Sequence, residues 1–221
     1  TNTLVGSPQA DGATTQYLFT AWTLTGNVSL AETLTGIDTN VVLALTNIAT
    51  LTWNWKTQYQ FAASSTGNGT VEGAADGWYD RDSSVTVTAV PSDVSYQFAG
   101  WTGDLPAGQT NDLAITLTMS QARTLVAHFE PSKWVLTIVS GRGNPNPSAG
   151  VYTNDYGTTL TNTLGGTPQA DGATTQYLFT AWTLTGNVSL AETLTGTDTN
   201  VVLTLTNNAS LAWNWQTNYW L

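Results

Sequence analysis

One long internal repeat constrains this chain more than any other feature. Residues 1–59 recur as residues 161–219, at an offset of 160 residues. The two copies differ at nine positions: Val5/Gly165, Ser7/Thr167, Ile37/Thr197, Ala44/Thr204, Ile48/Asn208, Thr50/Ser210, Thr52/Ala212, Lys56/Gln216 and Gln58/Asn218. Near-identity over this length indicates a recent duplication. Because a fixed period is the signature of modular arrays, the chain contains a little more than one full period of such an array.

The composition favours β-strands over helices. Hydrophobic residues make up 41% of the 221 residues, which is enough for packed cores, whereas charged residues make up only 9%, well below the usual quarter. Thr, Asn, Ser and Gly provide much of the remaining surface. Since β-branched and short polar side chains disfavour the interior of a helix, we predict an all-β chain.

The charge balance excludes several classes of partner. The formal net charge is −10, and only five Lys and Arg residues are available to meet phosphates, so neither nucleic acid nor an anionic membrane surface is an expected partner. No apolar run approaches the ~20 residues of a spanning helix, and we expect no membrane insertion. The absence of Cys favours a bacterial surface protein over a cytosolic chain or a disulfide-rich secreted domain.

Short segments with alternating polarity predict strands, and Gly, Asn and Asp residues predict the turns between them. In one segment, Asp112–Met119, we expect Leu113, Ile115, Leu117 and Met119 to share one face. The other strands expected are Ser84–Val90, Thr124–Phe129, Lys133–Val139, Asn40–Thr46 and Leu51–Trp55. Short strands at close spacing indicate small sheets.

A second, older repeat lies inside the long one. Gly67–Gly69 aligns with Gly141–Gly143, and Tyr96–Trp101 aligns with Tyr177–Trp182. Each unit then closes with an apolar strand that ends in an aromatic residue. We therefore predict three modules: an incomplete one at 1–59, a complete one at 60–131, and a second complete one at 132–221, whose 161–219 part duplicates 1–59.

Three strings of the middle module carry a family resemblance: Tyr96–Leu105, Ile115–Ser120 and Leu125–Phe129. They resemble the "Y-x-F-x-G-W-x-G" strand, the "I-T-x-T-M" strand and the closing "A-x-F" of divergent bacterial repeats related to the internalin B-repeat. The flanking copies depart from the first string, with Ala21–Leu24 and Ala181–Leu184 in place of its Gly-Trp-Thr-Gly. The resemblance implies small β-rich, grasp-like modules in a linear array on secreted bacterial proteins, with no catalytic residues to carry over.

No set of catalytic or metal-binding residues assembles in the sequence. His128 is the only histidine and lies in an alternating strand, so a nucleophile–His site has one candidate base and no nucleophile motif. Zinc or copper sites lack ligands, and we expect no cofactor and no enzyme activity. Calcium needs only oxygen ligands, and its best clusters are Asp80–Asp82, Asn154–Asp155 and Asp38–Asn40, which are also ordinary turn formers.

Ten tryptophans raise the question of carbohydrate binding, because flat aromatic faces stack on sugar rings. Trp78, in a turn region beside Tyr79, is the best candidate for an exposed aromatic contact. The others are expected to anchor cores or module contacts, because an aromatic side chain buries ~150–250 Å². These structural anchors are Trp22, Trp101, Trp182, Trp53, Trp55, Trp213 and Trp215.

Intramolecular isopeptide bonds stiffen many bacterial surface modules and need a Lys near an Asn or Asp. Only Lys56 and Lys133 are available. Lys56 is Gln216 in the twin copy, so a crosslink there is not part of the repeating design. Lys133 has no twin, and a crosslink at this residue stays open.

The sequence predicts a structural segment of an extracellular or cell-surface protein: a stalk, rod or filament. Module junctions at Trp55–Phe61 and Phe129–Trp134 leave almost no linker, which favours a fixed angle between neighbours. An adhesin-like or carbohydrate-binding module is the alternative. Residues 1–59 lack a leading glycine hairpin, so we expect an exposed sheet edge. This edge takes strands from another copy or chain, or the sequence is a slice of a longer array; the expected partners are thus neighbouring repeats, copies of itself, a glycan or a host protein.

Overall fold

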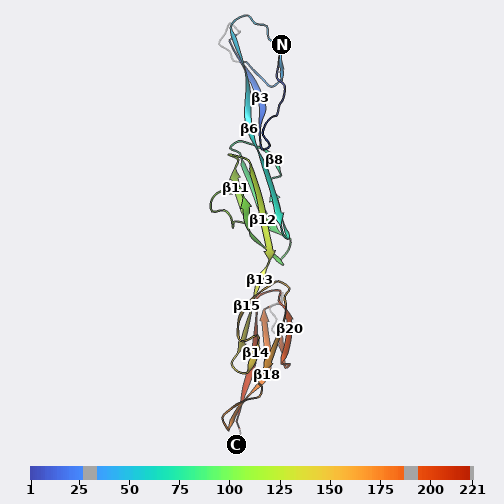
Figure 1. Cartoon of the computed structure of the whole chain (residues 1–221), viewed down its shortest axis with the longest axis vertical. Coiled ribbons are helices and arrows are strands. Elements are labelled where there is room, and N and C mark those ends of the chain that lie inside the picture. Colours follow the sequence, from blue (N-terminus) through green and yellow to red (C-terminus); the bar gives the residue numbers. More distant parts are fainter. Residues whose placement is uncertain (27–33, 187–193, 220–221) are drawn as a thin grey trace. The chain divides into compact units, whose positions relative to one another are not determined.

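The computed structural model describes residues 1–26, 34–186 and 194–219 (Figure 1). Within these residues the regular secondary structure consists of β-strands without any helix, which confirms the all-β prediction. In that part of the chain there is consequently no helix long and apolar enough to cross a membrane.

The strands follow one another at short spacing. Those up to residue 131 are β1 (Asn2–Thr3), β2 (Gln9–Asp11), β3 (Thr15–Gly26), β4 (Leu34–Gly36), β5 (Asn40–Val41), β6 (Ala49–Thr66), β7 (Gly69–Gly73), β8 (Gly77–Asp80), β9 (Ser84–Pro91), β10 (Tyr96–Gly103), β11 (Ala114–Thr118) and β12 (Arg123–Pro131). Those that follow are β13 (Lys133–Ser140), β14 (Asn144–Asn146), β15 (Gly150–Asp155), β16 (Thr159–Gly165), β17 (Gln169–Asp171), β18 (Thr175–Gly186), β19 (Leu194–Gly196), β20 (Asn200–Thr204) and β21 (Ala209–Tyr219).

The chain divides into two compact units. Unit 1 comprises Thr1–Pro91 and Phe98–Phe129, and unit 2 comprises Ser92–Gln97 and Glu130–Leu221. The predicted boundary between residues 59 and 60 falls inside β6, and the predicted boundary between residues 131 and 132 lies close to the division between the two units.

The middle and third modules have the same sheet topology. The middle module has the strand orders β10-β12-β6, with β8 on β6, and β11-β9-β7. The third module has the orders β18-β21-β13-β15 and β20-β16-β14. In each, the closing strand lies parallel to the opening strand, β12 against β6 and β21 against β13. The two modules are therefore built alike, although few of their residues are identical.

Strand β6 belongs both to the first repeat copy and to the middle module. Its first part, Ala49–Tyr59, pairs antiparallel with β3. Its last part, Phe61–Thr66, pairs parallel with β12, and β8 joins it at Gln58–Phe61. The closing strand of the first repeat copy thus continues without a break as the opening strand of the middle module, as Figure 1 shows within unit 1.

Along strands that face the two cores, buried and exposed residues alternate. In β9, for example, Val85, Val87 and Ala89 are buried while Ser84 and Thr86 are exposed, as expected for a strand with one face on a core. The buried core of the middle module is Phe61, Val85, Val87, Ala89, Trp101, Ile115, Leu117, Met119, Leu125, Ala127 and Phe129. That of the third module is Leu136, Ile138, Leu164, Leu184, Val201, Leu203, Leu205, Ala209, Leu211 and Trp213.

The two copies of the long repeat differ in burial, although their core residues are identical in sequence. Among the described residues of 161–219, the buried apolar side chains are Leu164, Leu184, Val201, Leu203, Leu205, Ala209, Leu211 and Trp213. Among those of 1–59, only Leu24 and Val41 are buried. Leu205 is 0% exposed, whereas its twin Leu45 is 70% exposed. The cause is the neighbouring strands, since β21 pairs with β13 but the described ladders give Ala49–Trp53 of β6 only β3.

Two predicted strands have different bounds in the structure. The strand expected at 112–119 is β11, Ala114–Thr118, and Leu113 precedes it and is exposed, so its expected place beside Ile115 on the buried face is wrong. The strand expected at 40–46 ends at Val41, because its partner β1 offers only two residues.

Candidate functional site

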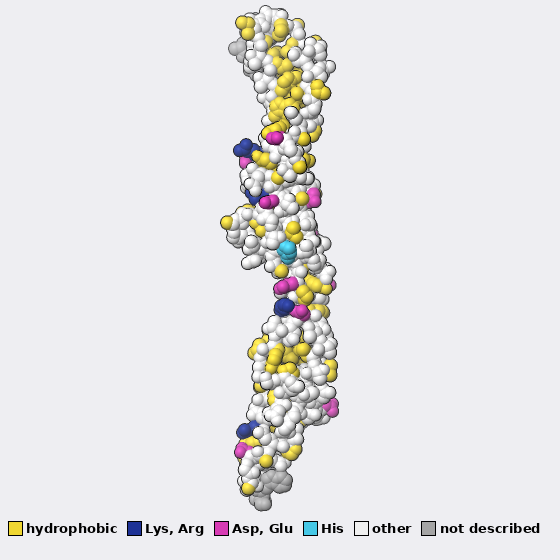
Figure 2. Space-filling view, in the orientation of Figure 1, with side chains coloured by type: hydrophobic (Ala, Val, Ile, Leu, Met, Phe, Trp, Pro, Cys, Tyr) yellow, Lys and Arg dark blue, Asp and Glu magenta, His cyan; other side chains and the backbone are white. Residues whose placement is uncertain are grey.

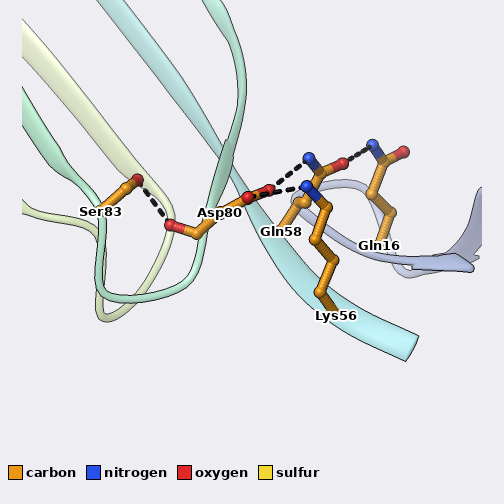
Figure 3. A network of polar contacts seen from close by, with 5 residues as sticks. All are labelled: Gln16, Lys56, Gln58, Asp80 and Ser83. Carbon is orange, nitrogen blue, oxygen red and sulfur yellow. Dashed lines mark hydrogen bonds and ion pairs between the residues drawn. The ribbon is translucent and has the colours of Figure 1, made fainter. Parts of the chain in front are cut away.

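A chain of polar side chains lies where β8 meets β6 and β3 in unit 1 (Figure 3). Lys56 Nζ donates to Asp80 Oδ2 over 2.7 Å, and Gln58 Nε2 donates to Asp80 Oδ1 over 2.7 Å. Gln16 Nε2 donates to Gln58 Oε1 over 2.8 Å. Ser83 Oγ donates to the backbone oxygen of Asp80 over 2.6 Å. The network connects β3 of the first repeat copy with the β8 turn of the middle module.

The electrostatics of this network are those of a structural contact. The hydrogen bond from the Lys56 ammonium, with that from Gln58, holds the pKa of the Asp80 carboxyl below its usual range. A carboxylate with a lowered pKa is a poor general base near neutral pH. Both charged side chains are also well exposed, so solvent and salt screen the pair. The network links β3, β6 and the β8 turn through side-chain contacts.

The sequence carried a signal for this network that sequence reasoning missed. Lys56 and Gln58 are replaced by Gln216 and Asn218 in the second copy, which accounts for two of the nine differences. Residues at alternate positions of a strand lie on one face. Two such changes together indicate that this face meets a different neighbour, and in the first copy that neighbour is Asp80.

Lys133, the other candidate for a crosslink, forms an ion pair with Asp155 across β13 and β15. Both side chains are about half exposed. The hydrogen bond to Asp155 raises the pKa of the Lys133 ammonium, so the amine stays protonated. In the structure this contact is an ion pair.

The candidate ligand contacts Trp78 and Tyr79 lie on opposite faces of β8. Trp78 is 38% exposed. Tyr79 is half-buried, packs edge-on against Phe61 at 5.9 Å between ring centroids, and donates its hydroxyl to the Ala75 backbone oxygen over 2.7 Å. The structure therefore does not bring the two rings together as one stacking platform.

The seven tryptophans expected as structural anchors are buried or half-buried. Trp101 is buried and donates its indole N–H to the Asp112 oxygen over 2.8 Å. Trp213 is buried, and the half-buried tryptophans are Trp22, Trp53, Trp55, Trp182 and Trp215. In each long repeat one phenylalanine packs edge-on against two tryptophans: Phe19 against Trp53 and Trp55, and Phe179 against Trp213 and Trp215.

His128 is held by two threonines. Its Nδ1 lies 2.7 Å from Thr66 Oγ1 of β6, and its Nε2 lies 2.7 Å from Thr102 Oγ1 of β10. The ring therefore bridges the strands on either side of β12. Both ring nitrogens already have partners, and this arrangement is that of a cross-strand polar contact.

The described residues bring together no group of three carboxylate or imidazole side chains that could hold a metal ion. In two of the three acidic clusters, a cation lies beside a carboxylate: Lys56 beside Asp80, and Lys133 beside Asp155. Unit 2 has an open depression of about 490 Å³. Its lining is Val135, Thr137, Thr185, Gly186, Asn208, Ala209 and Ser210, which includes neither a titratable nor an aromatic side chain.

The middle module matches the model of a known domain family. Residues 59–133 match the divergent InlB B-repeat domain. The match extends from Tyr59 in β6 to Lys133 at the start of β13, and it confirms for this stretch the resemblance to the internalin B-repeat. No curated protein and no solved structure matches the chain.

Proposed function

We propose that this chain is a structural repeat segment of a bacterial extracellular or cell-surface protein, a part of a stalk, rod or filament without catalytic activity. The family match supports this role, because divergent InlB B-repeats are a type of repeat domain associated with bacterial surface proteins. A polar, cysteine-free surface with a net charge of −10 also suits an extracellular setting.

The observation that carries the proposal is strand β6. Its 18 residues close the first repeat copy and open the middle module with no linker between them. A flexible linker would allow neighbours to reorient freely. Strand β6 instead belongs to one continuous sheet, in which its first part pairs with β3 and its last part with β12, and this favours a fixed geometry between the two repeats. The Lys56–Asp80–Gln58 network adds side-chain contacts at the same place.

Antibodies raised against the chain test the location. We expect them to label intact cells of the source bacterium, or to detect the chain in its culture medium. A signal that requires permeabilised cells would contradict the proposal.

Spin labels test the structural role. The chain has no Cys, so Thr70→Cys in unit 1 and Thr153→Cys in unit 2 place labels at two exposed strand positions. We expect a narrow distribution of distances between the labels, because β12 ends at Pro131 and β13 begins at Lys133. A broad distribution, as for a flexible tether, would count against a stalk or rod.

A glycan-binding role is the second candidate, and the exposure of Trp78 is the observation that favours it. A glycan array with the full chain and the Trp78→Ala variant separates the two roles. Binding that is lost on substitution supports an adhesive module, whereas the absence of binding leaves the structural role as the better explanation.

A further inference from the structure

The first repeat copy leaves partly exposed an apolar face that the second copy buries: Leu45 is exposed, and the other residues of the face are half-buried. Six positions are identical in sequence and buried only in the second copy: Leu4/Leu164, Leu43/Leu203, Leu45/Leu205, Ala49/Ala209, Leu51/Leu211 and Trp53/Trp213. We call the first-copy members the open face. Figure 2 shows hydrophobic side chains gathered on the surface of this part of the chain. Exposed apolar surface of this kind marks an interaction site.

The structure itself contains the segment that covers the equivalent face. In the third module, Leu136–Ser140 of β13 pairs parallel with Ala209–Trp213. Leu160 and Thr159 pair with Leu203 and Thr204. Both backbone groups of Leu205 are also bonded, since Gly157 N donates to its oxygen over 2.8 Å and its N donates to Thr158 O over 2.9 Å. Residues 133–160 thus supply both strands and backbone partners.

We propose that the open face is an acceptor for a β-hairpin segment with the sequence features of Lys133–Leu160, supplied by another repeat of this type. The register follows from the twin: Leu136 opposite Ala49, Ile138 opposite Leu51 and Ser140 opposite Trp53. Affinity comes from main-chain bonds to a sheet edge and specificity from apolar side chains that enter the face, as in other cases of β-strand addition. The inference rests on the proposed structural role and names the partner in it.

Two of the substitutions between the copies lie where the segment would dock. Ile48 is 89% exposed, and its twin Asn208 accepts a hydrogen bond from Val135 N over 2.9 Å. Val5 is exposed, and its twin Gly165 lies opposite Asn144 of β14. Both positions therefore lie beside the incoming segment in the predicted register. In the first copy each carries a larger apolar side chain, and the Ile48 side chain has no oxygen to accept the hydrogen bond that Asn208 accepts from Val135 N. The docked segment would therefore gain apolar contact at these positions and lose one hydrogen bond.

The test mixes the full chain with a synthetic peptide of residues 133–160. A hairpin alone is marginally stable in water, so the peptide is expected to fold on binding. We expect one peptide per chain, a change in tryptophan fluorescence, and slower amide exchange at Ala49–Trp53 without change at Ala209–Trp213. A chain with the 133–160 sequence fused ahead of Thr1 is the positive control for a fully covered face.

Three variants make the test specific. Leu45→Asn should weaken peptide binding at least about tenfold, because a polar amide would enter the covered face without a matched partner. Val42→Asn is the matched control on the same segment, since Val42 and its twin Val202 are both exposed, and it should leave binding unchanged. A peptide with Leu136→Asn and Ile138→Asn should not bind.

Several results would overturn the inference. The first is absence of binding while the fused control protects Ala49–Trp53. The others are binding that Leu45→Asn does not weaken, a footprint elsewhere, and self-association of the chain alone that covers the face with residues other than 133–160. Failure of the fused control to protect this segment would overturn it too. None of these outcomes affects labelling of intact cells, which tests the structural role separately.

Discussion

At the scale of single residues, the twin repeats place one leucine in two environments. Leu205 is fully buried in the third module, and Leu45 is mostly exposed in the first copy. Removing a buried leucine side chain costs about 2–5 kcal/mol, through lost transfer free energy and the cavity left behind. An exposed side chain away from special features contributes within about 0.5 kcal/mol.

We therefore predict that Leu205→Ala lowers the free energy of unfolding of unit 2 by about 2–5 kcal/mol, while Leu45→Ala changes that of unit 1 by less than about 0.5 kcal/mol. Urea denaturation followed by resolved amide resonances of each unit measures both values. Equal losses from the two substitutions would mean that the open face is covered in solution.

The Asp80 carboxyl should make the stability of unit 1 depend on pH. Its pKa is lowered in the folded chain, first by the Lys56 hydrogen bond. Its stabilising contribution is therefore present above the ordinary aspartate range, about pH 4, and is lost as the pH falls through the folded pKa. Carboxyl ¹³C resonances should give Asp80 a pKa below the ordinary value, and Lys56→Gln should raise it. An ordinary pKa for Asp80 in the unmodified chain would exclude the network of Figure 3.

At the scale of elements, β6 couples the first repeat copy to the middle module. Gln60 lies near the middle of this strand, opposite Trp78 of β8, and its N–H donates to Thr14 O over 3.0 Å. Proline removes that donor and cannot pair there. We predict that Gln60→Pro separates two parts of unit 1 that otherwise unfold together.

Resonances in β3 and β9 report the two parts during urea unfolding. Their midpoints should coincide in the unmodified chain and in Gln60→Ala, which keeps the N–H, and diverge in Gln60→Pro. Different urea midpoints for β3 and β9 already in the unmodified chain would show that β6 does not couple the first repeat copy to the middle module.

Much of the element pattern could be predicted from sequence, because it depends on neighbours in the chain. The alternation of Val85, Val87 and Ala89 predicts β9 directly, and the run from Trp55 to Phe61 predicts a junction without a linker. The exposure of Leu45 could not be predicted from its own repeat, since an identical repeat buries Leu205. Burial there depends on residues 133–160, which lie outside the duplicated segment.

Glycines at strand ends illustrate a second limit. Gly103 ends β10 with φ 109°, beside the Thr124 backbone oxygen, where a side chain would collide. Aligned by its Trp-x-x spacing, the long repeat has leucine at this place. In the structure the same role falls to Gly26 and Gly186, two residues further on, with φ 79° and 74°. Because β3 and β18 are longer than β10, the glycine at the strand end comes two residues later in the long repeat. The Trp-x-x spacing carries no information about strand length.

At the scale of the whole molecule, the repeats differ in the strands that lie beside them. The middle and third modules share a topology with a closing strand parallel to an opening strand. The first copy has the same core side chains on its closing strand, Ala49, Leu51 and Trp53, without that parallel neighbour in the described residues. Local stability should therefore follow the neighbours and not the sequence, as in repeat proteins generally.

Native-state hydrogen exchange of the chain alone tests this claim most directly. Amides of Ala49–Trp53 and Ala209–Trp213 are compared in one sample, and the Thr50/Ser210 and Thr52/Ala212 differences help to distinguish their resonances. We predict that exchange, averaged over the segment, is at least about tenfold faster in the first copy, because that edge opens locally. Equal protection of the two segments would contradict it.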